Sequence, residues 1–168
     1  MAFDIHPLRA QELARVEADL PFHSHALWLD WLYRQDRGYI TLFNCWWDGM
    51  AVGHAMVAWD PRGDPTIERI GCPWIYDVLT HPNYRSRGVG TAMLRVCEAA
   101  ARARGIPEIG LGVAVTNTRA RALYERLGYC DTGLGPQVTT GQWSGPDGVT
   151  RLWEDHVQYL LKRVAAHQ

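Results

Sequence analysis

The chain has 168 residues, with 17 Lys and Arg against 18 Asp and Glu, so its formal net charge is −1. This length suits a single domain over residues 1–168, and the balanced charge argues against a nucleic-acid partner, so any anion must be bound by a local site. No apolar run approaches the roughly 18 residues of a membrane helix, and the N-terminus lacks the apolar region of a signal peptide. We therefore expect no membrane partner and a cytoplasmic location.

The four cysteines lie far apart in the sequence, at Cys45, Cys72, Cys97 and Cys130. They form no CxxC pair and have no histidines at the spacing of metal ligands. None lies in a context that lowers the pKa of its thiol, so none is predicted to be a nucleophile. We interpret all four as reduced thiols in the core, and we expect no metal site.

The first 59 residues have the spacing of three strands and two helices. Leu13, Val16 and Leu20 recur at helical intervals, and Asp48-Gly49 between two β-rich runs is a strong hairpin signal. We predict a strand over residues 3–8, helices over 9–20 and 26–38, and strands over 39–47 and 50–59.

The rest of the chain alternates strands and helices. Residues 61–68 are interpreted as a loop, and the Ile, Trp, Tyr and Val that follow predict a strand that ends at Pro82. We then predict a helix over 88–104, a strand over 108–115 and a helix over 117–128. Glycines and prolines interrupt the tail, where we predict two strands joined by a long loop.

The stretch HPNYRSRGVGTAML, residues 81–94, places two glycines directly before an expected helix. A dinucleotide-binding fingerprint needs a third glycine where Met93 stands, and a phosphate loop needs Gly-Lys-Ser/Thr where Gly90 is followed by Thr91. Both nucleotide motifs are therefore excluded. The glycines can serve turn geometry with a positive φ. They can also admit an anion to the exposed N–H groups of the helix N-terminus.

Two motifs in this half of the chain point to one family. Arg85 to Gly90 reads R-x-x-G-x-G and resembles the acyl-CoA signature of the GNAT superfamily of N-acyltransferases. Residues 117–129, NTRARALYERLGY, resemble the N-x-x-A-x-x-L-Y-E-x-x-G-F/Y segment of that family, at the expected separation. The order of elements agrees over essentially the whole chain. The resemblance implies an α+β fold, a three-layer α/β/α sandwich around a mixed, mostly antiparallel sheet whose fourth and fifth strands splay apart to admit the cofactor.

The resemblance also implies acetyl-CoA as the co-substrate. The backbone amides from Arg87 through Thr91 would hold its pyrophosphate, and the end of the fourth strand would bind the pantetheine arm like an added strand. Asn117 would reach the pantetheine or its phosphate, although an Asn directly before a helix is also a common N-cap. The residues assigned to the cofactor are Val78, Leu79, Thr80, Arg85, Ser86, Arg87, Gly88, Val89, Gly90, Thr91, Asn117 and Tyr124.

The resemblance assigns a catalytic role to Tyr124. A tyrosine at this place in the family lies near the thioester sulfur and protonates or orients the departing thiolate. The alternative is a buried core tyrosine, because the helical face around it is apolar. The implied reaction is direct transfer, in which an amine attacks the acetyl carbonyl and backbone N–H groups of the fourth strand stabilise the oxyanion. An alkyl ammonium has a pKa of about 10, so it must first lose a proton.

Three candidates remain for the group that takes this proton. Asp77 is the only carboxylate close to the motif, but it can instead be a buried structural acid; Tyr76 and an ordered water are the other candidates. In a regular strand Trp74, Tyr76 and Val78 share one face, and Asp77 lies on the other. His81 ends the strand, where a lone histidine is more often structural than catalytic.

The acceptor pocket of this superfamily is commonly shaped by the first helices and the loop between the last two strands. Here these regions carry aromatic and imidazole side chains that can bind an apolar amine, hold a cation over a ring, or pack a core or dimer surface. They are Phe22, His23, His25, Trp28, Trp31, Trp143 and Trp153.

We predict an N-acetyltransferase that acts on a primary amine of a small molecule, peptide or protein. A non-catalytic acyl-CoA-binding or sensing module is the alternative. The identity of the amine, the acyl length and a homodimeric state stay open.

Overall fold

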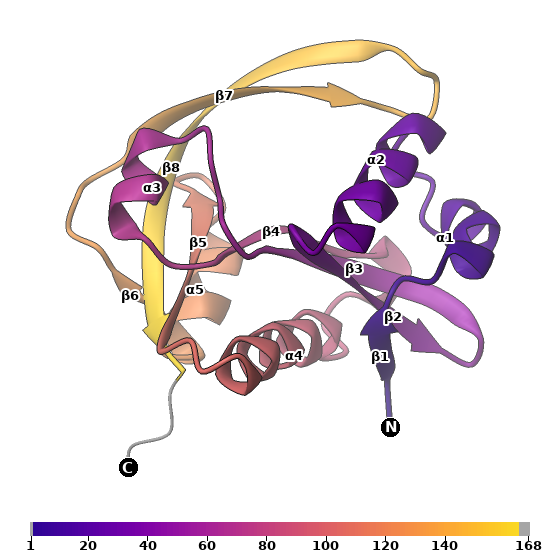
Figure 1. Cartoon of the computed structure of the whole chain (residues 1–168), viewed down its shortest axis with the longest axis horizontal. Coiled ribbons are helices and arrows are strands. Elements are labelled where there is room, and N and C mark those ends of the chain that lie inside the picture. Colours follow the sequence, from indigo (N-terminus) through magenta and orange to yellow (C-terminus); the bar gives the residue numbers. More distant parts are fainter. Residues whose placement is uncertain (1, 165–168) are drawn as a thin grey trace.

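A computed structural model describes residues 2–164 of the chain. Its eight strands form one sheet in the order β1-β2-β3-β4-β5-β8-β6, with β7 pairing to β8 off this path (Figure 1). Paired strands are antiparallel except for β4 and β5. The predicted mixed, mostly antiparallel sheet is therefore confirmed. The strands are β1 (Asp4–Pro7), β2 (Ile40–Trp47), β3 (Met50–Ala58), β4 (Trp74–Thr80), β5 (Glu108–Ala114), β6 (Cys130–Asp131), β7 (Gln137–Ser144) and β8 (Thr150–Arg163).

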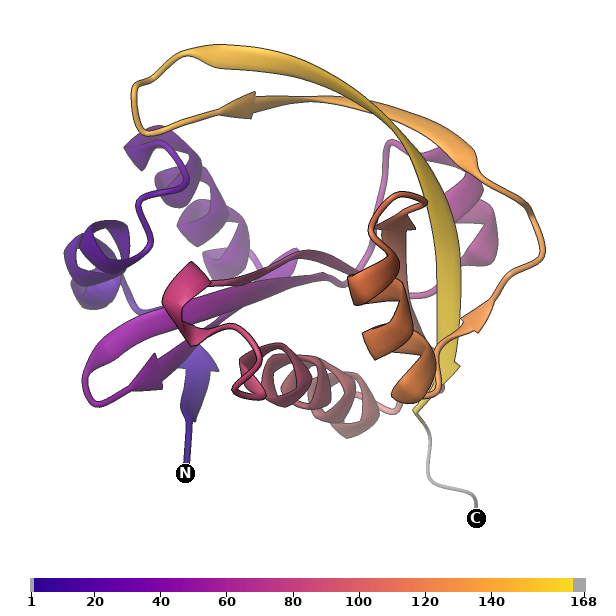
Figure 2. The same cartoon turned by 180° about the vertical axis from the view of Figure 1, so that it is seen from behind.

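Helices cover both faces of this sheet, as predicted for three layers (Figures 1 and 2). On one face α1 and α2 bury Val16 and Trp28. On the other face α4 and α5 bury Met93 and Tyr124. Among residues 2–164 no helix is long and apolar enough to cross a membrane. The helices are η1 (Ala10–Glu12), α1 (Leu13–Asp19), α2 (His25–Asp36), α3 (Pro65–Ile70), η2 (Pro82–Tyr84), α4 (Val89–Ala103) and α5 (Thr118–Arg126), of which η1 and η2 are 3-10 turns.

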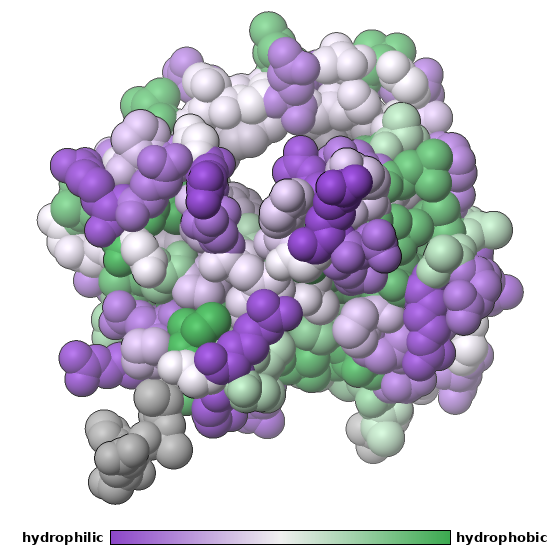
Figure 3. All heavy atoms as spheres, in the orientation of Figure 1, coloured by the Kyte–Doolittle hydropathy of each residue, from purple (hydrophilic) through white to green (hydrophobic). Residues whose placement is uncertain are grey.

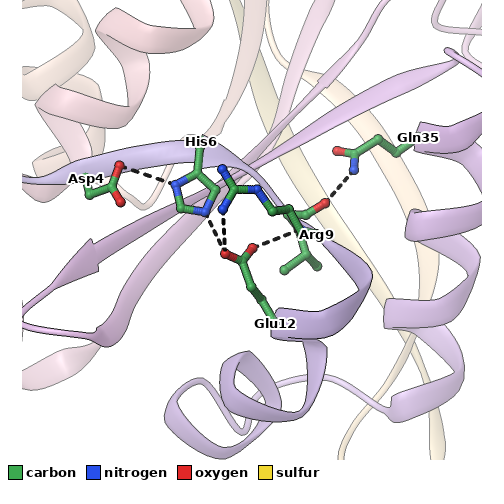
Figure 4. Close-up of polar contacts among 6 residues, drawn as sticks. Asp4, His6, Arg9, Glu12 and Gln35 are labelled. Atoms are coloured by element: carbon green, nitrogen blue, oxygen red, sulfur yellow. Dashed lines mark hydrogen bonds and ion pairs between the residues drawn. The ribbon is translucent and has the colours of Figure 1, made fainter.

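Polar contacts fix the first helices against β1. Glu12 accepts a hydrogen bond from the backbone N–H of Arg9 at 3.0 Å, and its carboxylate contacts Nε2 of His6 at 2.9 Å (Figure 4). From α2, the Gln35 amide donates to the carbonyl of Leu8 at 2.8 Å. These contacts hold α1 and α2, and with them the connection between the two helices, on one face of the sheet.

β4 and β5 meet at one end only. Their parallel ladder joins Trp74 to Gly110 and Ile75 to Leu111, and within residues 2–164 it goes no further. The Trp74 ring lies against Gly110, where an added Cβ would stand 2.1 Å from a ring carbon, so only glycine lets the strands approach here. From residue 76 onward the edge of β4 toward β5 is unpaired. The predicted splaying of the fourth and fifth strands is therefore confirmed (Figure 1).

The prediction of a loop over residues 61–68 is wrong, because Pro65–Ile70 forms helix α3. Asp64 caps this helix by accepting a hydrogen bond from the Thr66 N–H at 2.8 Å, and Gly71 ends it with a φ of +74°. A helix of six residues is too short to show a hydrophobic period. Only its caps, with proline at the first helical position, could have indicated it.

The predicted long loop in the tail is also wrong. Residues 137–144 form β7, which pairs with β8 along its whole length in an antiparallel hairpin. Most of its side chains are exposed or half-buried, so no clear hydrophobic alternation indicated a strand. The Trp153 ring packs against the backbone of Gly141, where an added Cβ would stand 2.6 Å from the ring.

This hairpin arches over the molecule. At its tip the carbonyl of Ser144 accepts a hydrogen bond from the backbone N–H of Ser24, the N-cap residue of α2, at 3.1 Å. The arch therefore reaches from β8 to α2 (Figure 1), and Figure 3 shows the molecule hollowed beneath it. We call this space, below the β7–β8 hairpin and between α2 and α3, the arch opening.

Candidate active site

The turn before α4 exposes main-chain donors. Gly88 precedes the helix with a φ of +86°, and Ser86 also has a left-handed φ, of +62°. No side chain among residues 2–164 caps this helix end. The N–H groups of Val89, Gly90 and Thr91 lie in the first turn, where an α-helix offers them no internal partner. With the helix dipole they form a site for an anion.

The two glycines of this turn are there for different reasons. Turn geometry explains Gly88, because side chains rarely adopt its φ. Gly90 does not have such a φ, and an added Cβ would only touch Leu123 at 3.7 Å and Thr80 at 3.9 Å, which is ordinary contact. No atom of residues 2–164 therefore requires glycine at 90. A glycine here leaves the backbone N–H groups of the turn accessible, which an approaching anion needs.

The polar side chains assigned to the cofactor surround this turn. Arg85, Ser86 and Arg87 are exposed. The Arg87 guanidinium lies 5.3 Å from the centre of the Trp47 ring, and the Arg119 Nη2 donates to the Ser86 hydroxyl at 2.7 Å. Arg119 belongs to α5 and therefore adds a cation to the turn from the other side of the gap between β4 and β5.

β4 carries a bulge beside the gap, and the expected alternation of its side chains is wrong. His54 of β3 faces Leu79, and Met56 faces Tyr76, so the single residue between them in β3 faces two residues of β4, Asp77 and Val78. The extra residue is Asp77, with a left-handed φ of +54°. A bulge leaves backbone groups out of the ladder, so we expect N–H groups here to be available to an oxyanion.

The bulge brings Asp77 next to two histidines. Oδ2 of Asp77 lies 3.1 Å from Nε2 of His23 and 3.6 Å from Nε2 of His54, and the two imidazole nitrogens are 3.3 Å apart. His54 is fully buried, His23 is 8% exposed, and the Asp77 side chain is 30% exposed. The three side chains, from β3, β4 and the α1–α2 connection, form one polar cluster, which we call the His–Asp cluster.

Burial and charge set the protonation of the His–Asp cluster. Burial lowers the pKa of His54 to about 4, although the charge of Asp77 opposes this, so its imidazole is neutral at physiological pH. Burial raises the pKa of Asp77, but the polar contact with His23 and the electrostatic influence of the two neighbouring histidines outweigh it, and the pKa lies below its ordinary value. Asp77 is therefore an ionised carboxylate.

Tyr76 is a poor candidate for the proton acceptor. Its ring packs with Trp74 and Tyr159 in a separate cluster under α3. Burial, with the charge of Asp64 as a smaller cause, raises its pKa to about 12. A phenol with this pKa stays protonated at neutral pH, so Asp77 and water are the remaining candidates for the base.

Tyr124 has features of both roles weighed from the sequence. Its ring is 8% exposed and lies 6.1 Å from the Tyr129 ring in an edge-on pair, as expected of a core tyrosine. Burial raises the pKa of Tyr124 above its ordinary value, so the hydroxyl keeps its proton. A protonated phenol in the core layer under α5 is suited to donate that proton to a thiolate.

Two polar residues of the motifs have structural contacts. The Asn117 side chain accepts a hydrogen bond from the Ala120 N–H at 3.1 Å, so its capping role is confirmed, while its contact with pantetheine stays a prediction. Nδ1 of His81 accepts from the Asn83 N–H at 3.2 Å and starts η2. His81 is therefore held in a turn, in agreement with the structural role favoured above.

The prediction that all four cysteines are reduced thiols in the core is confirmed in part. Burial raises the pKa of Cys45 and Cys97 to about 12 and that of Cys72 to about 11, so these thiols are inert. All four cysteines are free. Cys130 is exposed, so its assignment to the core is wrong.

Sequence reasoning assigned a candidate catalytic role to only one of the three members of the His–Asp cluster, Asp77. His54 received no role, and His23 was only one of several aromatic side chains near the acceptor. The signal for His54 is weak: it is one histidine within an otherwise apolar strand, MAVGHAMVA. Nothing local indicated that a bulge in β4 would turn Asp77 toward it.

The splayed fourth and fifth strands and the uncapped helix N-terminus beside them agree with what the resemblance to acyl-CoA-dependent acyltransferases implies. Residues 4–129 match the acetyltransferase (GNAT) family, and the chain belongs to this family. The predicted membership of the GNAT superfamily is therefore confirmed.

Among curated proteins, an uncharacterized N-acetyltransferase of Methanocaldococcus jannaschii is 33% identical over 99 residues, which are 59% of this chain and 42% of that protein. The matched part thus spans less than half of that relative.

Solved structures share the fold at lower identity. The Salmonella typhimurium protein YncA with its cofactor acetyl-CoA has a TM-score of 0.68 at 19% identity and covers 99% of this chain and 96% of its own. The ribosomal-protein-S18-alanine N-acetyltransferase of Escherichia coli has a TM-score of 0.64 at 18% identity, over 99% of this chain and 97% of its own. At these identities the likeness shows the fold alone.

Proposed function

We propose that this chain transfers the acetyl group of acetyl-CoA directly to a primary amine. The observation that carries the proposal is the uncapped N-terminus of α4 at the mouth of the gap between β4 and β5, with a glycine at position 90 that no atom of residues 2–164 requires. Bound acetyl-CoA supplies a thioester carbonyl for attack. The chain supplies binding, orientation and proton transfer.

The donor side is built from main chain. The amides from Arg87 through Thr91 hold the diphosphate, as the exposed donors of the first helical turn favour. The unpaired edge of β4 at Val78, Leu79 and Thr80 binds the pantetheine arm as an added strand, a mode in which main-chain hydrogen bonds give the affinity. This places the thioester at the bulge.

The bulge and Tyr124 handle the charges that develop during transfer. Free N–H groups at the bulge stabilise the oxygen of the tetrahedral intermediate. When the carbon–sulfur bond breaks, the protonated hydroxyl of Tyr124 donates its proton to the thiolate. Neither role needs a covalent bond between acetyl group and protein.

The His–Asp cluster serves the amine. The acceptor arrives as an ammonium ion, and the ionised Asp77 attracts it and accepts its proton directly or through water. The neutral imidazole of His54 keeps Asp77 in place without competing as a cation. The cluster lies on the α1–α2 face, whereas α4 binds its anion on the other, so donor and acceptor reach the bulge from opposite faces.

The arch opening limits the shape of the acceptor. Because the hairpin is tied to α2 through Ser144 and Ser24, an amine on the α1–α2 face must approach beneath the arch. This favours a small amine or the free end of a peptide over a lysine on a folded surface. The Escherichia coli relative named above acts, by its name, on an alanine of a ribosomal protein. A homodimeric state and a cytoplasmic location stay predictions.

The test is release of free CoA thiol from acetyl-CoA with a panel of amines. The panel contains small aliphatic and aromatic amines, short peptides with free N-termini, and peptides with a blocked N-terminus and an internal lysine. We expect turnover with at least one of the first two classes, and propionyl- and succinyl-CoA in the same assay define the acyl length. Tight binding of acetyl-CoA without transfer to any amine would refute the proposal in favour of a sensing module.

A further inference from the structure

The His–Asp cluster has the composition of a metal site. It brings together two imidazole nitrogens and one carboxylate oxygen, all within 4.8 Å of one another, from three separate elements of the fold. Imidazole and carboxylate are the common protein ligands of zinc. Magnesium and calcium prefer oxygen ligands alone, so the two imidazoles argue against them.

The spacing of the three atoms matches tetrahedral coordination. The separations are 3.1 Å from His23 to Asp77, 3.3 Å from His23 to His54, and 3.6 Å from His54 to Asp77. Ligands at about 2.0–2.1 Å from a tetrahedral metal lie about 3.3 Å apart, the edge of the tetrahedron. A square-planar ion would instead hold neighbouring ligands about 2.8 Å apart and opposite ones about 4 Å apart.

The surroundings hold the ligands in this arrangement. The His23 ring lies edge-on to Trp28 and Trp31, at 5.6 and 5.0 Å, and the His54 ring lies 5.2 Å from Trp28. Asp77 keeps a left-handed φ that a non-glycine residue rarely adopts. Its Oδ2 is buried, and no residue in the described part of the chain gives it a hydrogen bond of normal geometry. An atom in this position is suited to a metal ligand.

A neighbour can support the imidazole of His54. Asn44 is its cross-strand partner in β2, fully buried, and both polar atoms of its amide lack a partner among residues 2–164. Nδ1 of His54 is also buried without a hydrogen-bond partner among residues 2–164. Directly opposed residues have Cβ atoms about 5 Å apart, so one water can join the Nδ1–H to the Asn44 amide oxygen. Such a bond fixes the tautomer that leaves Nε2 free for a metal.

We propose that His23, His54 and Asp77 bind one divalent transition-metal ion of the zinc class in tetrahedral coordination, with the fourth position open to water or substrate. Asp77, the half-exposed member, provides the access. This binding does not depend on acetyl transfer. A proton and a metal use the same lone pairs, so the cluster accepts one or the other at a given moment. No sequence motif indicated this site, because its three ligands come from segments that are distant in the sequence.

The experiment measures metal binding directly, without acetyl-CoA or amine. The full chain, stripped with a chelator and dialysed, is titrated with Zn²⁺ by calorimetry and with Co²⁺ by visible absorption, in which a tetrahedral site gives intense bands. We expect one ion per chain and a tetrahedral Co²⁺ spectrum. The variants Asp77→Asn and His23→Gln should each weaken binding about 100-fold or more, since each removes a ligand.

Two controls separate this site from others. His25→Gln removes an exposed histidine two positions from His23, and Cys130→Ser removes the exposed thiol; both should bind metal like the unchanged chain. Thermal unfolding shows which variants are folded. Asp77→Asn, at a half-exposed position, keeps the test decisive if a histidine variant fails to fold. Absence of binding, an octahedral Co²⁺ spectrum, or binding that survives Asp77→Asn but is lost in a control variant would overturn the proposal.

Discussion

The two sides of the proposed active site are built from different parts of the chain. The proposed donor side is a continuous segment, residues 85–91, with exposed backbone N–H groups at the start of α4. The proposed acceptor side is assembled from His23, His54 and Asp77, which lie in a loop, a central strand and a bulge. One side depends on main-chain geometry, and the other on side chains that only the complete fold brings together.

This difference has a consequence for substitution. A site made of backbone amides tolerates changes of side chain unless the new side chain occupies the space of the ligand. A site made of three converging side chains loses its function when any one of the three is replaced. The donor side should therefore be sensitive to volume, and the acceptor side to residue type.

Tyr124 is the proposed proton donor to the departing thiolate, and its replacement should give the largest effect. Tyr124→Phe removes the proton donor and keeps the ring, so we expect kcat to fall about 1000-fold, within the usual range for a general acid. The affinity for acetyl-CoA should be unchanged. Steady-state kinetics and calorimetry measure the two quantities.

Tyr129→Phe is the matched control. The Tyr129 hydroxyl is buried beside the Glu98 carboxylate and makes no hydrogen bond of normal geometry among residues 2–164, so its loss should leave kcat unchanged and alter stability little. Full turnover by Tyr124→Phe, or equal losses in both variants, would show that Tyr124 is only a core residue.

Gly90→Ala tests the volume argument on the donor side. A Cβ at this position makes only ordinary contacts with protein atoms, so the fold is kept and the helix gains roughly 0.5–1 kcal/mol because alanine replaces glycine. The same Cβ occupies the approach of the phosphates. We expect acetyl-CoA affinity to fall about 100-fold, or about 2.7 kcal/mol.

Ala99→Gly, on the exposed face of the same helix, should have the opposite effects. It should lower stability and leave binding unchanged. The two variants therefore separate helix stability from ligand contact. If Gly90→Ala bound acetyl-CoA as tightly as the unchanged chain, the diphosphate could not lie against these amides.

The two sides also differ in how far the sequence predicted them. The glycine turn and the helix that follows it form a local pattern, in which spacing alone determines which amides are exposed. Most helices and strands were predicted from local periodicity, whereas the layers and the splayed strands were implied by the resemblance to the GNAT superfamily. The short helix α3 was missed because it carries no period, and β7 because it is largely exposed.

The acceptor side could not be predicted in the same way. The face on which Asp77 lies depends on one extra residue in β4, and a bulge reverses the alternation that the sequence suggests. His54 meets His23 across 31 residues of sequence. Such a meeting depends on the packing of α2 against β3, which no local signal encodes.

The last prediction concerns the pH dependence of stability that the buried His54 imposes. Its pKa is about 4 in the folded chain and about 6.5 when unfolded, so below pH 6.5 the unfolded state binds more protons. Stability therefore falls as the pH falls through this window, and we expect a loss of about 1.5 kcal/mol between pH 6.5 and pH 5. Asp77 contributes little there, because its pKa is below 3.8.

Denaturant unfolding at several pH values, with a chelator present, measures this loss. His54→Gln should remove it, because the unfolded chain then has no corresponding group to protonate. His25 is an exposed histidine that pairs with Glu17 at 2.7 Å, and the variant His25→Gln should keep the loss of stability at low pH. If the slope of stability against pH were the same in His54→Gln as in the unchanged chain, His54 would not be the buried neutral imidazole on which the chemistry of the acceptor side depends.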